Sequence, residues 1–361
     1  MWFEHLQSRL DDLAAHDLTR RLRTLHSGTA PRQRVATADG GTRELLLFCS
    51  NDYLGLAAHP AIADALVEGA RRWGGGSGAS PLVSGHSAAH AAVADWLAQA
   101  YAHHIPQARA LGFCTGYMAN LGVLTALGDA DTELFCEQLN HASLIDGARL
   151  ARGRVSRYPH ADVAALATAL AASTAPRKLI VTDSVFSMDG DIAPLRELLA
   201  LADAHDALLV VDDAHGFGVL GEQGLGAIEA LGLRSERLVL VGTLGKAAGV
   251  AGAFVVAHAT VIDYLLQTAR NFIFSTAAPP AVEHAVLAAL HLLHGEEGRE
   301  RRAALGRRVA QWRSGVADLL ARHPALPWRL PASATPIQPL KDGGYRDTLV
   351  VTCRAGGFHD V

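Results

Sequence analysis

A single lysine, Lys246, stands among small residues directly after an apolar run, in the segment LVLVGTLGKAAG at 238–249. Lysine avoids burial because removing an ammonium group from water is expensive. A lysine flanked by glycine and alanine at the end of a core strand therefore suits an amine of lowered pKa, which forms an imine with a carbonyl group. Taken alone, the segment also fits a surface lysine in a loop.

Two acidic residues and a histidine follow a second apolar run, in the segment ALLVVDDAHGFG at 207–218. Adjacent carboxylates on an extended chain point to opposite sides, so we expect only Asp212 to face a site at the carboxyl end of this strand. A buried carboxylate there keeps a pyridine nitrogen protonated, which makes the ring an electron sink. His215 is spaced to reach the phenolic oxygen of such a ring. A helix N-cap for Asp213, a structural role for His215 and a metal site of the Asp-Asp-x-His type stay open, although no further ligand stands at metal-like spacing.

Two weaker segments follow other apolar runs. Backbone N–H groups at Gly116 and Tyr117 begin a predicted helix, where a phosphate is favoured by the helix dipole. His141, in Asn-His-Ala-Ser at 140–143, is placed to stack on an aromatic ring. Tyr117 fits a packing role equally well, and a lone histidine is more often structural. With Lys246 and Asp212, the four segments indicate a pyridoxal-5′-phosphate (PLP) enzyme.

A glycine-rich stretch, GGGSGAS at 74–80, raises the alternative of a nucleotide-binding protein. It lacks the Gly-Lys-Ser/Thr ending of a phosphate-binding P-loop and does not lie between a strand and a helix. We therefore expect a tight or mobile turn near the active site.

The elements that carry these residues alternate between strand-length apolar runs and longer helical runs. Strands are predicted at 45–49, 108–113, 133–136, 178–182, 207–211 and 238–242. Their Val/Leu-rich character indicates a mainly parallel sheet covered on both faces. The run at 251–257 follows too closely for a helical crossover, so we expect it to be antiparallel. Helical patterns open the chain and end at 26–28, occupy 161–175, and run from 281 to 321 with a break near Gly295 and Gly298; a C-terminal unit then contains 337–340.

Composition places the chain among ordinary globular proteins. It has 361 residues, half of them hydrophobic, and a formal net charge of −4. This excludes a polyelectrolyte surface and indicates neither a nucleic-acid nor a membrane partner. The N-terminus has no apolar signal core. Cys49, Cys114, Cys136 and Cys353 form no Cys-x-x-Cys pair, so core thiols in the reducing cytoplasm are expected, without disulfides or a zinc site.

The ordered motifs of this chain resemble the α-oxoamine synthase family of fold-type I PLP enzymes. They are SNDYLGL at 50–56, VSGH at 83–86, NHAS at 140–143, DSVFSMDGD at 183–191, DDAHGFG at 212–218, GEQGLG at 221–226, TLGK at 243–246 and FST at 274–276. The resemblance implies an acyltransferase that condenses an amino acid with an acyl thioester and releases carbon dioxide. The forms at 50–56 and 212–218 favour the member of biotin biosynthesis that uses L-alanine and a pimeloyl thioester of CoA or a carrier protein.

Carried over by position, the resemblance makes Lys246 the Schiff-base lysine. His141 would stack on the cofactor ring and also contact the substrate. Asp212 would pair with the pyridine nitrogen, and His215 would bond the phenolic oxygen.

The same resemblance implies further cofactor contacts, several of them around the phosphate, at Gly116, Tyr117, Ser187 and Thr243. Arg20 matches an arginine that binds the acyl substrate. Asn51 matches a residue near the amino-acid carboxylate. Asp183 stands where glutamate is commoner in the family.

The resemblance also implies a fold: a large domain with a mostly parallel seven-stranded sheet between helices, and a small α+β C-terminal domain. We expect an N-terminal helix and arm at 1–44, the PLP-binding domain at 45–282 and the small domain at 283–361, incomplete relative to the family. The closing strands with their carboxylate-binding arginine are not matched, and Arg354 lies in no matching motif. A homodimer with interface active sites is implied. Two rivals stay open, a sister synthase that uses glycine and another acyl-CoA, and a PLP-binding chain with little catalysis.

Overall fold

Two separately packed units make up the computed structural model, which describes residues 1–341 and 349–352. The first, Met1–Leu47, contains helix α1 (Trp2–Ala15) and a hairpin of β1 (Arg32–Ala36) and β2 (Thr42–Leu46). The second begins at Phe48. The predicted division at 44/45 and 282/283 stays a prediction.

The first unit corrects two predictions. The opening helix ends at Ala15 rather than near residue 26, because Asp17 adopts a left-handed backbone with φ of 56° and its N–H bonds to the carbonyl of Ala14. The apolar run at 45–49 is not a strand of the large sheet. Its first residues belong to β2, which the turn at Gly40, with φ of 83°, folds back onto β1.

The second unit is built on a seven-stranded sheet with the order β3-β9-β8-β7-β6-β4-β5. Its strands are β3 (Ala108–Phe113), β4 (Thr132–Glu137), β5 (Arg154–Tyr158), β6 (Arg177–Asp183), β7 (Ala207–Asp212), β8 (Leu238–Thr243) and β9 (Ala253–His258). Strand β9 is antiparallel to both neighbours, and the pairs from β8 to β5 are parallel. The mostly parallel seven-stranded sheet is therefore confirmed. Strand β5 was missed because its sequence, RVSRY, is charged and lies at an exposed edge.

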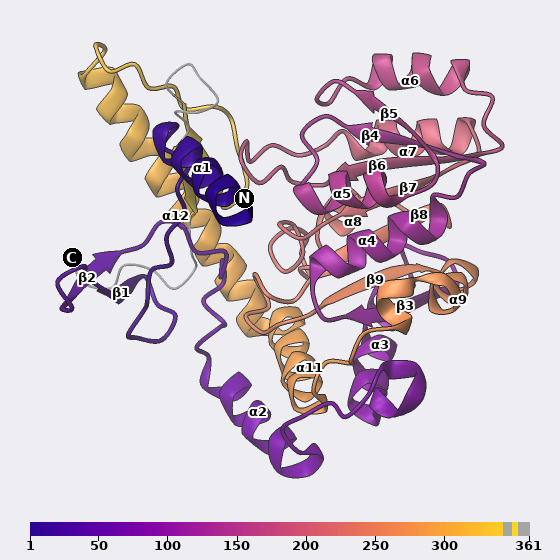
Figure 1. Ribbon diagram of the computed structural model, residues 1–361, viewed down its shortest axis with the longest axis horizontal. Helices are drawn as coiled ribbons and strands as arrows, with labels where there is room; N and C mark the ends of the chain where they lie inside the picture. Colours follow the sequence, from indigo (N-terminus) through magenta and orange to yellow (C-terminus); the bar gives the residue numbers. More distant parts are fainter. Residues whose placement is uncertain (342–348, 353–361) are drawn as a thin grey trace. The chain divides into compact units, whose positions relative to one another are not determined.

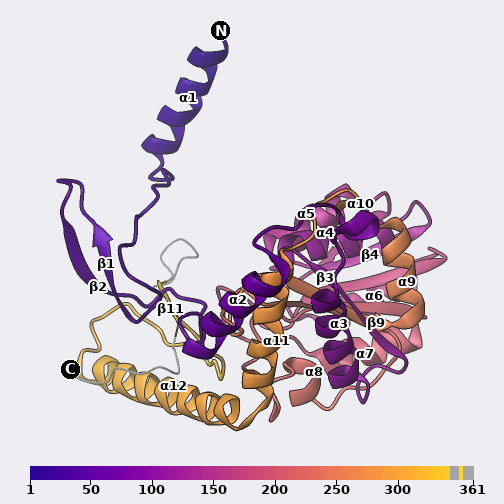
Figure 2. The ribbon, with the colours of Figure 1, turned by 90° about the horizontal axis from the view of Figure 1, so that it is seen from below.

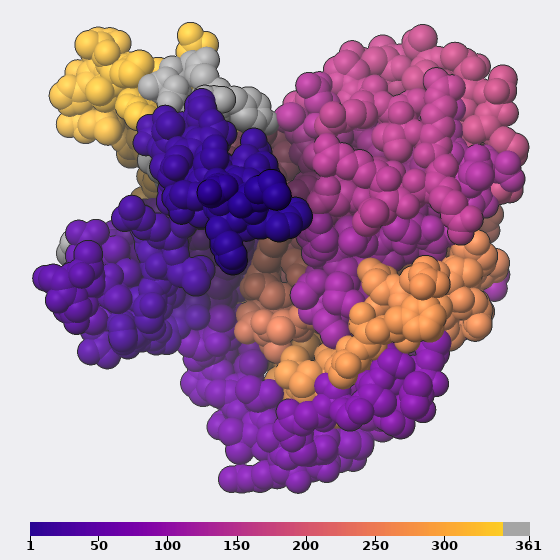
Figure 3. Space-filling view, viewed as in Figure 1, coloured from indigo at the N-terminus to yellow at the C-terminus, as the bar shows by residue number. Residues whose placement is uncertain are grey.

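Both faces of this sheet are buried, as the continuous apolar strands predict. Within β4, Phe135 packs into one hydrophobic cluster while its neighbours Leu134 and Cys136 pack into the other. Four helices cover one face: α4 (Gly116–Leu127), α5 (Ala142–Leu150), α9 (Ala259–Thr268) and α10 (Arg270–Ile273). Five helices cover the other face: α3 (Ala88–Tyr101), α6 (Val163–Ala172), α7 (Leu195–Ala204), α8 (Ala227–Ala230) and α11 (Pro280–His294). Figure 1 shows the strands enclosed between these two layers. In Figure 3, the orange surface of α9 and α10 adjoins the magenta surface of α4, although these segments are far apart in sequence.

The long C-terminal helical run is divided as predicted. Helix α11 ends at His294, and α12 (Glu296–Arg322) begins after Gly295, whose extended ψ of −173° interrupts the helix. In both views α12 runs away from the sheet from the end of α11, and α2 (Pro60–Trp73) lies alongside α11 (Figures 1 and 2). A short π-helical turn, Pro81–Gly85, precedes α3.

After α12 the chain forms β10 (Ile337–Leu340), which pairs with β11 (Leu349–Thr352). Cys136 is buried as expected, Cys114 is partly buried, and Cys49 is exposed, which corrects the prediction of a core thiol there. Cys353 and Arg354 lie outside the described residues. Among residues 1–341 and 349–352, no helix is long and apolar enough to cross a membrane.

Candidate active site

Polar residues gather where four parallel strands end. Strands β6, β7 and β8 end at Asp183, Asp212 and Thr243, and His141 follows β4. Ligands bind at this edge of open α/β sheets. A pocket of about 310 Å³ opens here, lined by Cys49, Asn51, His141, Ser187, His215, Lys246 and Ile337. The structure therefore brings together four predicted site residues from separate motifs, along with Asn51.

Lys246 follows β8 and reaches into this pocket. Its Nζ lies 2.8 Å from Nε2 of His215, whose Nδ1 lies 2.6 Å from the hydroxyl of Tyr53. Burial lowers the pKa of Lys246, and the negative charges of Asp212 and Asp183 oppose that shift. Burial also holds the pKa of His215 well below its ordinary value, helped by the charges of Lys246 and His141. The pair is therefore a neutral imidazole beside an amine that loses its proton more readily than an ordinary lysine.

Asp212 is oriented by a hydrogen bond from Asn120, a fully buried residue of α4. The Nδ2 of Asn120 donates to Oδ2 of Asp212 at 2.6 Å and to Oγ of Ser143 at 2.8 Å. The other oxygen of Asp212 accepts from the N–H of Ala214 at 2.9 Å. Each carboxylate oxygen thus holds one hydrogen bond and keeps a lone pair for a further donor.

The same network orients His141. Its Nδ1 accepts from the backbone N–H of Ser143 at 3.2 Å, so this nitrogen carries a lone pair. The hydroxyl of Ser143 lies 2.7 Å from the same nitrogen and donates to it, because its oxygen already accepts from Asn120. The neutral ring therefore carries its proton on Nε2.

The two adjacent aspartates point apart, as expected from the strand geometry. Asp213 accepts from the hydroxyl of Ser184 and from the N–H of Ala227 at 2.9 Å, the first residue of α8. Capping a helix is therefore the role of Asp213. Asp183 is the register partner of Asp212 across β6 and β7, and burial together with that neighbouring charge raises the pKa of Asp183 well above its ordinary value. Its Oδ2 accepts from the backbone N–H of His141 at 2.7 Å.

The loop that carries Ser187 is held at Asp191 by a hydrogen bond with His160. The two ring nitrogens of His160 each lie 2.9 Å from a carboxylate oxygen, one of Glu137 and one of Asp191. Partial burial disfavours the charged ring, but the two carboxylates outweigh it and raise the pKa of His160. The ring also packs edge-on against Phe186 at a centroid distance of 4.6 Å. Ser187 is therefore presented on a braced loop.

The predicted phosphate contacts lie at the start of α4. A Cβ built on Gly116 would lie 3.7 Å from Cβ of Thr243, so these two predicted positions are neighbours. Tyr117 is exposed, and its hydroxyl donates to Asp146 at 2.5 Å. These residues do not line the 310 Å³ pocket. Arg20 belongs to the first unit, where it is exposed.

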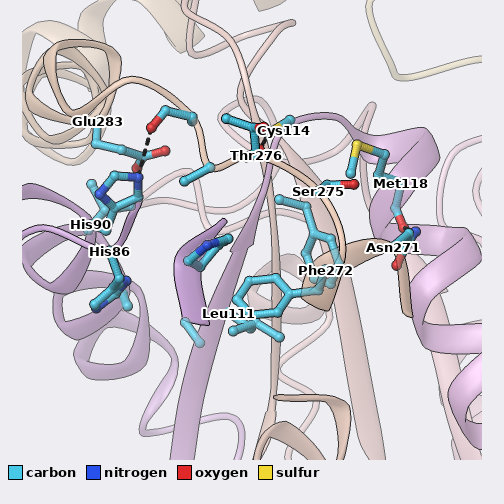
Figure 4. A pocket seen from close by; sticks show the side chains of 18 of the residues that line it. His86, His90, Leu111, Cys114, Met118, Asn271, Phe272, Ser275, Thr276 and Glu283 are labelled. Carbon is cyan, nitrogen blue, oxygen red and sulfur yellow. Dashed lines mark hydrogen bonds between the residues drawn. The ribbon is translucent and has the colours of Figure 1, made fainter. Parts of the chain in front are cut away.

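A second, smaller cavity of about 70 Å³ lies among α3, β3, α10 and the start of α11 (Figure 4). Glu283 lines it together with His90, whose Nε2 bonds the carbonyl of Ala278 at 3.0 Å. Glu283 is only 7% exposed, and burial raises its pKa to about 7.

Three site residues escaped the sequence analysis. Tyr53 and Ser143 lie within the motifs SNDYLGL and NHAS without an assigned role, and Asn120 lies four residues after Gly116 in the predicted helix. Each acts by touching a predicted site residue rather than by facing the pocket itself. Of the three, only Asn120 gave a signal, as a polar residue within the otherwise apolar helical segment GYMANLGVLTAL.

Comparison with known proteins identifies the family. The model of the aminotransferase class I and II family matches residues 43–344. An 8-amino-7-oxononanoate synthase of Cupriavidus taiwanensis is 63% identical over 360 residues, which cover 99% of this chain and 88% of that protein. The enzyme of the same name from Cupriavidus pinatubonensis is 60% identical over 355 residues, covering 98% and 86%.

Solved structures agree in fold. A serine palmitoyltransferase from S. paucimobilis, solved with PLP and myriocin bound, superposes with a TM-score of 0.80 at 27% identity, covering 95% of this chain and 86% of that one. An 8-amino-7-oxononanoate synthase from Francisella tularensis gives 0.70 at 27% identity, with coverage of 86% and 92%. The chain therefore belongs to the aminotransferase class I and II family and, within it, to the family of the 8-amino-7-oxononanoate synthases.

Proposed function

We propose that this chain condenses L-alanine with a pimeloyl thioester to give 8-amino-7-oxononanoate, carbon dioxide and the free thiol carrier. The observation that carries the proposal is Lys246, a partly buried amine of lowered pKa that lies 2.8 Å from His215 and near two buried aspartates. High identity to synthases of that name supports the same reaction.

The residues present suit PLP. Asp212 keeps a lone pair on each oxygen and is oriented by Asn120, as a partner of a protonated pyridine nitrogen must be. The first N–H groups of α4, at Gly116 and Tyr117, have no carbonyl partner within the helix and lie beside Thr243, which suits a phosphate. With Ser187, these residues would hold the cofactor.

PLP, when bound, takes up the electron pair left at a substrate carbon that loses a proton or a carboxylate. Lys246 would hold the cofactor through its amine, and the free amine of Lys246 would accept the Cα proton of alanine. Asp212 would keep the pyridine nitrogen protonated. His215 would donate a hydrogen bond to the phenolic oxygen, and His141 would support the ring and contact the substrate.

The same amine of Lys246 returns a proton to the product carbon after carbon dioxide has left. Burial lowers its pKa, which makes the amine a better proton donor than an ordinary lysine ammonium. Arg20 as the acyl-substrate contact and Asn51 as a neighbour of the alanine carboxylate follow from the family resemblance. So do a homodimer with interface active sites and the division into an N-terminal arm, a PLP-binding domain and a small C-terminal domain. The cytoplasm as location follows from the unpaired cysteines.

Borohydride reduction of the PLP-loaded protein, followed by peptide mapping, tests the assignment. The pyridoxyl label is expected on Lys246, and a label on another lysine refutes it. Absorption spectra recorded on adding L-alanine or glycine, then pimeloyl-CoA, separate the two amino acids, because the pocket must accept or exclude one methyl group. Release of free thiol with alanine and pimeloyl-CoA is the expected outcome. A spectral response without thiol release contradicts the proposed condensation.

A further inference from the structure

Tyr53 is 0% exposed, and its hydroxyl contacts two residues that line the pocket, His215 and Asn51. Its hydroxyl lies 2.6 Å from Nδ1 of His215 and 3.2 Å from Oδ1 of Asn51. On the other side of the ring, Nε2 of His215 lies 2.8 Å from Nζ of Lys246. Four side chains thus form one hydrogen-bonded line from Asn51 to Lys246.

The loop that carries Tyr53 is firmly held. The carboxylate of Asp52 accepts from the N–H of Leu56 at 2.8 Å, and Arg301 of α12 donates to the carbonyl of Leu54 at 2.9 Å. Arg301 is in turn paired with Glu297, with the closest atoms 2.6 Å apart. The hydroxyl of Tyr53 therefore has a fixed position, and only the direction of its O–H bond is free to change.

Two complete arrangements of protons fit this line. In the first, Lys246 is an ammonium that donates to Nε2 of His215, Nδ1–H donates to Tyr53, and the hydroxyl of Tyr53 donates to Asn51. In the second, the hydroxyl has turned to donate to Nδ1, so that Nε2 carries the ring proton and Lys246 is a neutral amine. The two differ by one proton, which Lys246 loses. In both, every donor of the imidazole has an acceptor.

We propose that Tyr53 is a positioning residue whose hydroxyl allows His215 to exchange tautomers, accepting from Lys246 in the free protein and donating from Nε2 once the cofactor is attached. This inference rests on the proposed function, because the second arrangement presents Nε2–H to the phenolic oxygen. A hydroxyl is required at this place since it both donates and accepts, whereas a carbonyl or an ammonium would permit only one tautomer.

Three further titratable groups act on this hydrogen-bonded line. His141 faces His215, and Asp183 and Asp212 act on Lys246. The two aspartates favour the ammonium, and burial favours the amine. Opposing effects therefore act on the proton of Lys246, and the hydrogen bonds of Tyr53 contribute to the choice between the two arrangements.

The variant Tyr53→Phe removes only the hydroxyl. With no acceptor near Nδ1, a proton there would be buried and unpaired, so we expect His215 to carry its proton on Nε2 in all states. The matched control is Tyr101→Phe, another fully buried tyrosine, whose hydroxyl donates to the carbonyl of Leu225 at 2.8 Å. Both variants remove one buried hydroxyl with its hydrogen bonds, and only the hydroxyl of Tyr53 contacts His215.

The tautomer is measured from the ¹⁵N shifts of His215 in histidine-labelled protein, with His215→Gln to assign the signal. Wild type and Tyr101→Phe are expected to carry the proton on Nδ1 without PLP and on Nε2 with it, while Tyr53→Phe carries it on Nε2 throughout. The pH at which PLP attachment reaches half its maximal rate is expected to fall by about one unit in Tyr53→Phe, since the ammonium of Lys246 loses its acceptor.

A wild-type His215 that keeps one tautomer with and without PLP overturns the inference, as does a Tyr53→Phe protein that still exchanges. Failure of the proposed function is seen separately, as an absence of borohydride-trapped label on Lys246. Even if the proposed function fails, the role of Tyr53 is tested by the cofactor-free proteins, in which we expect Nδ1–H in wild type and Nε2–H in Tyr53→Phe.

Discussion

Replacing Glu283 by glutamine is expected to remove a pH-dependent loss of stability. Glu283 is 7% exposed beside the 70 Å³ cavity, and burial raises its pKa to about 7 from an ordinary value of 4.5. Between these two pH values the unfolded chain ionises its carboxyl while the folded protein keeps the proton. The folded protein therefore binds more protons, and its stability falls as pH rises through this window.

The magnitude follows from the shift. Each unit of pKa corresponds to about 1.4 kcal/mol, so the ionised carboxylate of Glu283 costs the folded state about 3 kcal/mol above pH 7. Glutamine has nearly the same shape and no charge. We expect Glu283→Gln to match wild type near pH 4.5 and to exceed it by up to about 3 kcal/mol at pH 8.

Urea unfolding of both PLP-loaded proteins across about pH 5 to 9 measures this difference through the transition midpoints. The control is Glu297→Gln, which removes a carboxylate whose pKa is lowered by hydrogen bonds from Arg301 and His59. Its effect should lack the rise of up to about 3 kcal/mol between pH 4.5 and pH 8 that is expected for Glu283→Gln. A difference between Glu283→Gln and wild type that is flat from pH 5 to 8, or that grows toward acid, refutes the reasoning.

Three further changes test the supports of the site. Asn120→Ala leaves Asp212 without its 2.6 Å donor and should weaken PLP binding by about tenfold, measured by fluorescence titration, with little change in the spectrum of the free protein. His160→Gln removes an imidazolium of raised pKa that bridges two carboxylates; wild type should lose that support as pH rises through the folded pKa, whereas the variant lacks this loss in thermal melts. Gly249→Ala should destabilise by more than about 1 kcal/mol in urea unfolding, because φ is 70° and a Cβ would lie 2.4 Å from a backbone nitrogen.

The parts of the fold that were predictable are those with strong periodic signals. Apolar strands alternating with helices predicted the sheet, and the short spacing before β9 predicted its antiparallel direction, which is confirmed. The family and the fold-type I architecture are likewise confirmed. The hairpin of β1 and β2 was not predicted, since Leu45 and Leu46 resemble a core strand and only the turn at Gly40 indicates otherwise.

In the candidate site, the residues at the strand ends were predictable from the sequence, and the residues that orient them were not. Lys246, Asp212 and His141 follow apolar strands directly, so their convergence at one sheet edge follows from parallel topology. Tyr53 could not be linked to His215 in this way, because 162 residues separate them and the contact exists only in the folded chain. The same holds for Asn120, which meets Asp212 from a helix across 92 residues.

The electrostatics of the pocket follow from strand register. Because β6 and β7 are parallel and paired Asp183 to Asp212, their side chains lie on the same face and two carboxylates are forced together. Burial first and that repulsion second raise the pKa of Asp183, while the N–H of His141 and the positive charge of Lys246 lower it. A slip of one residue in β7 would instead present Asp213, which the folded chain uses to bind Ser184 and to cap α8. The buried strands that fix this register therefore also fix which carboxylate acts on Lys246, and so link the apolar core directly to the polar site at its edge.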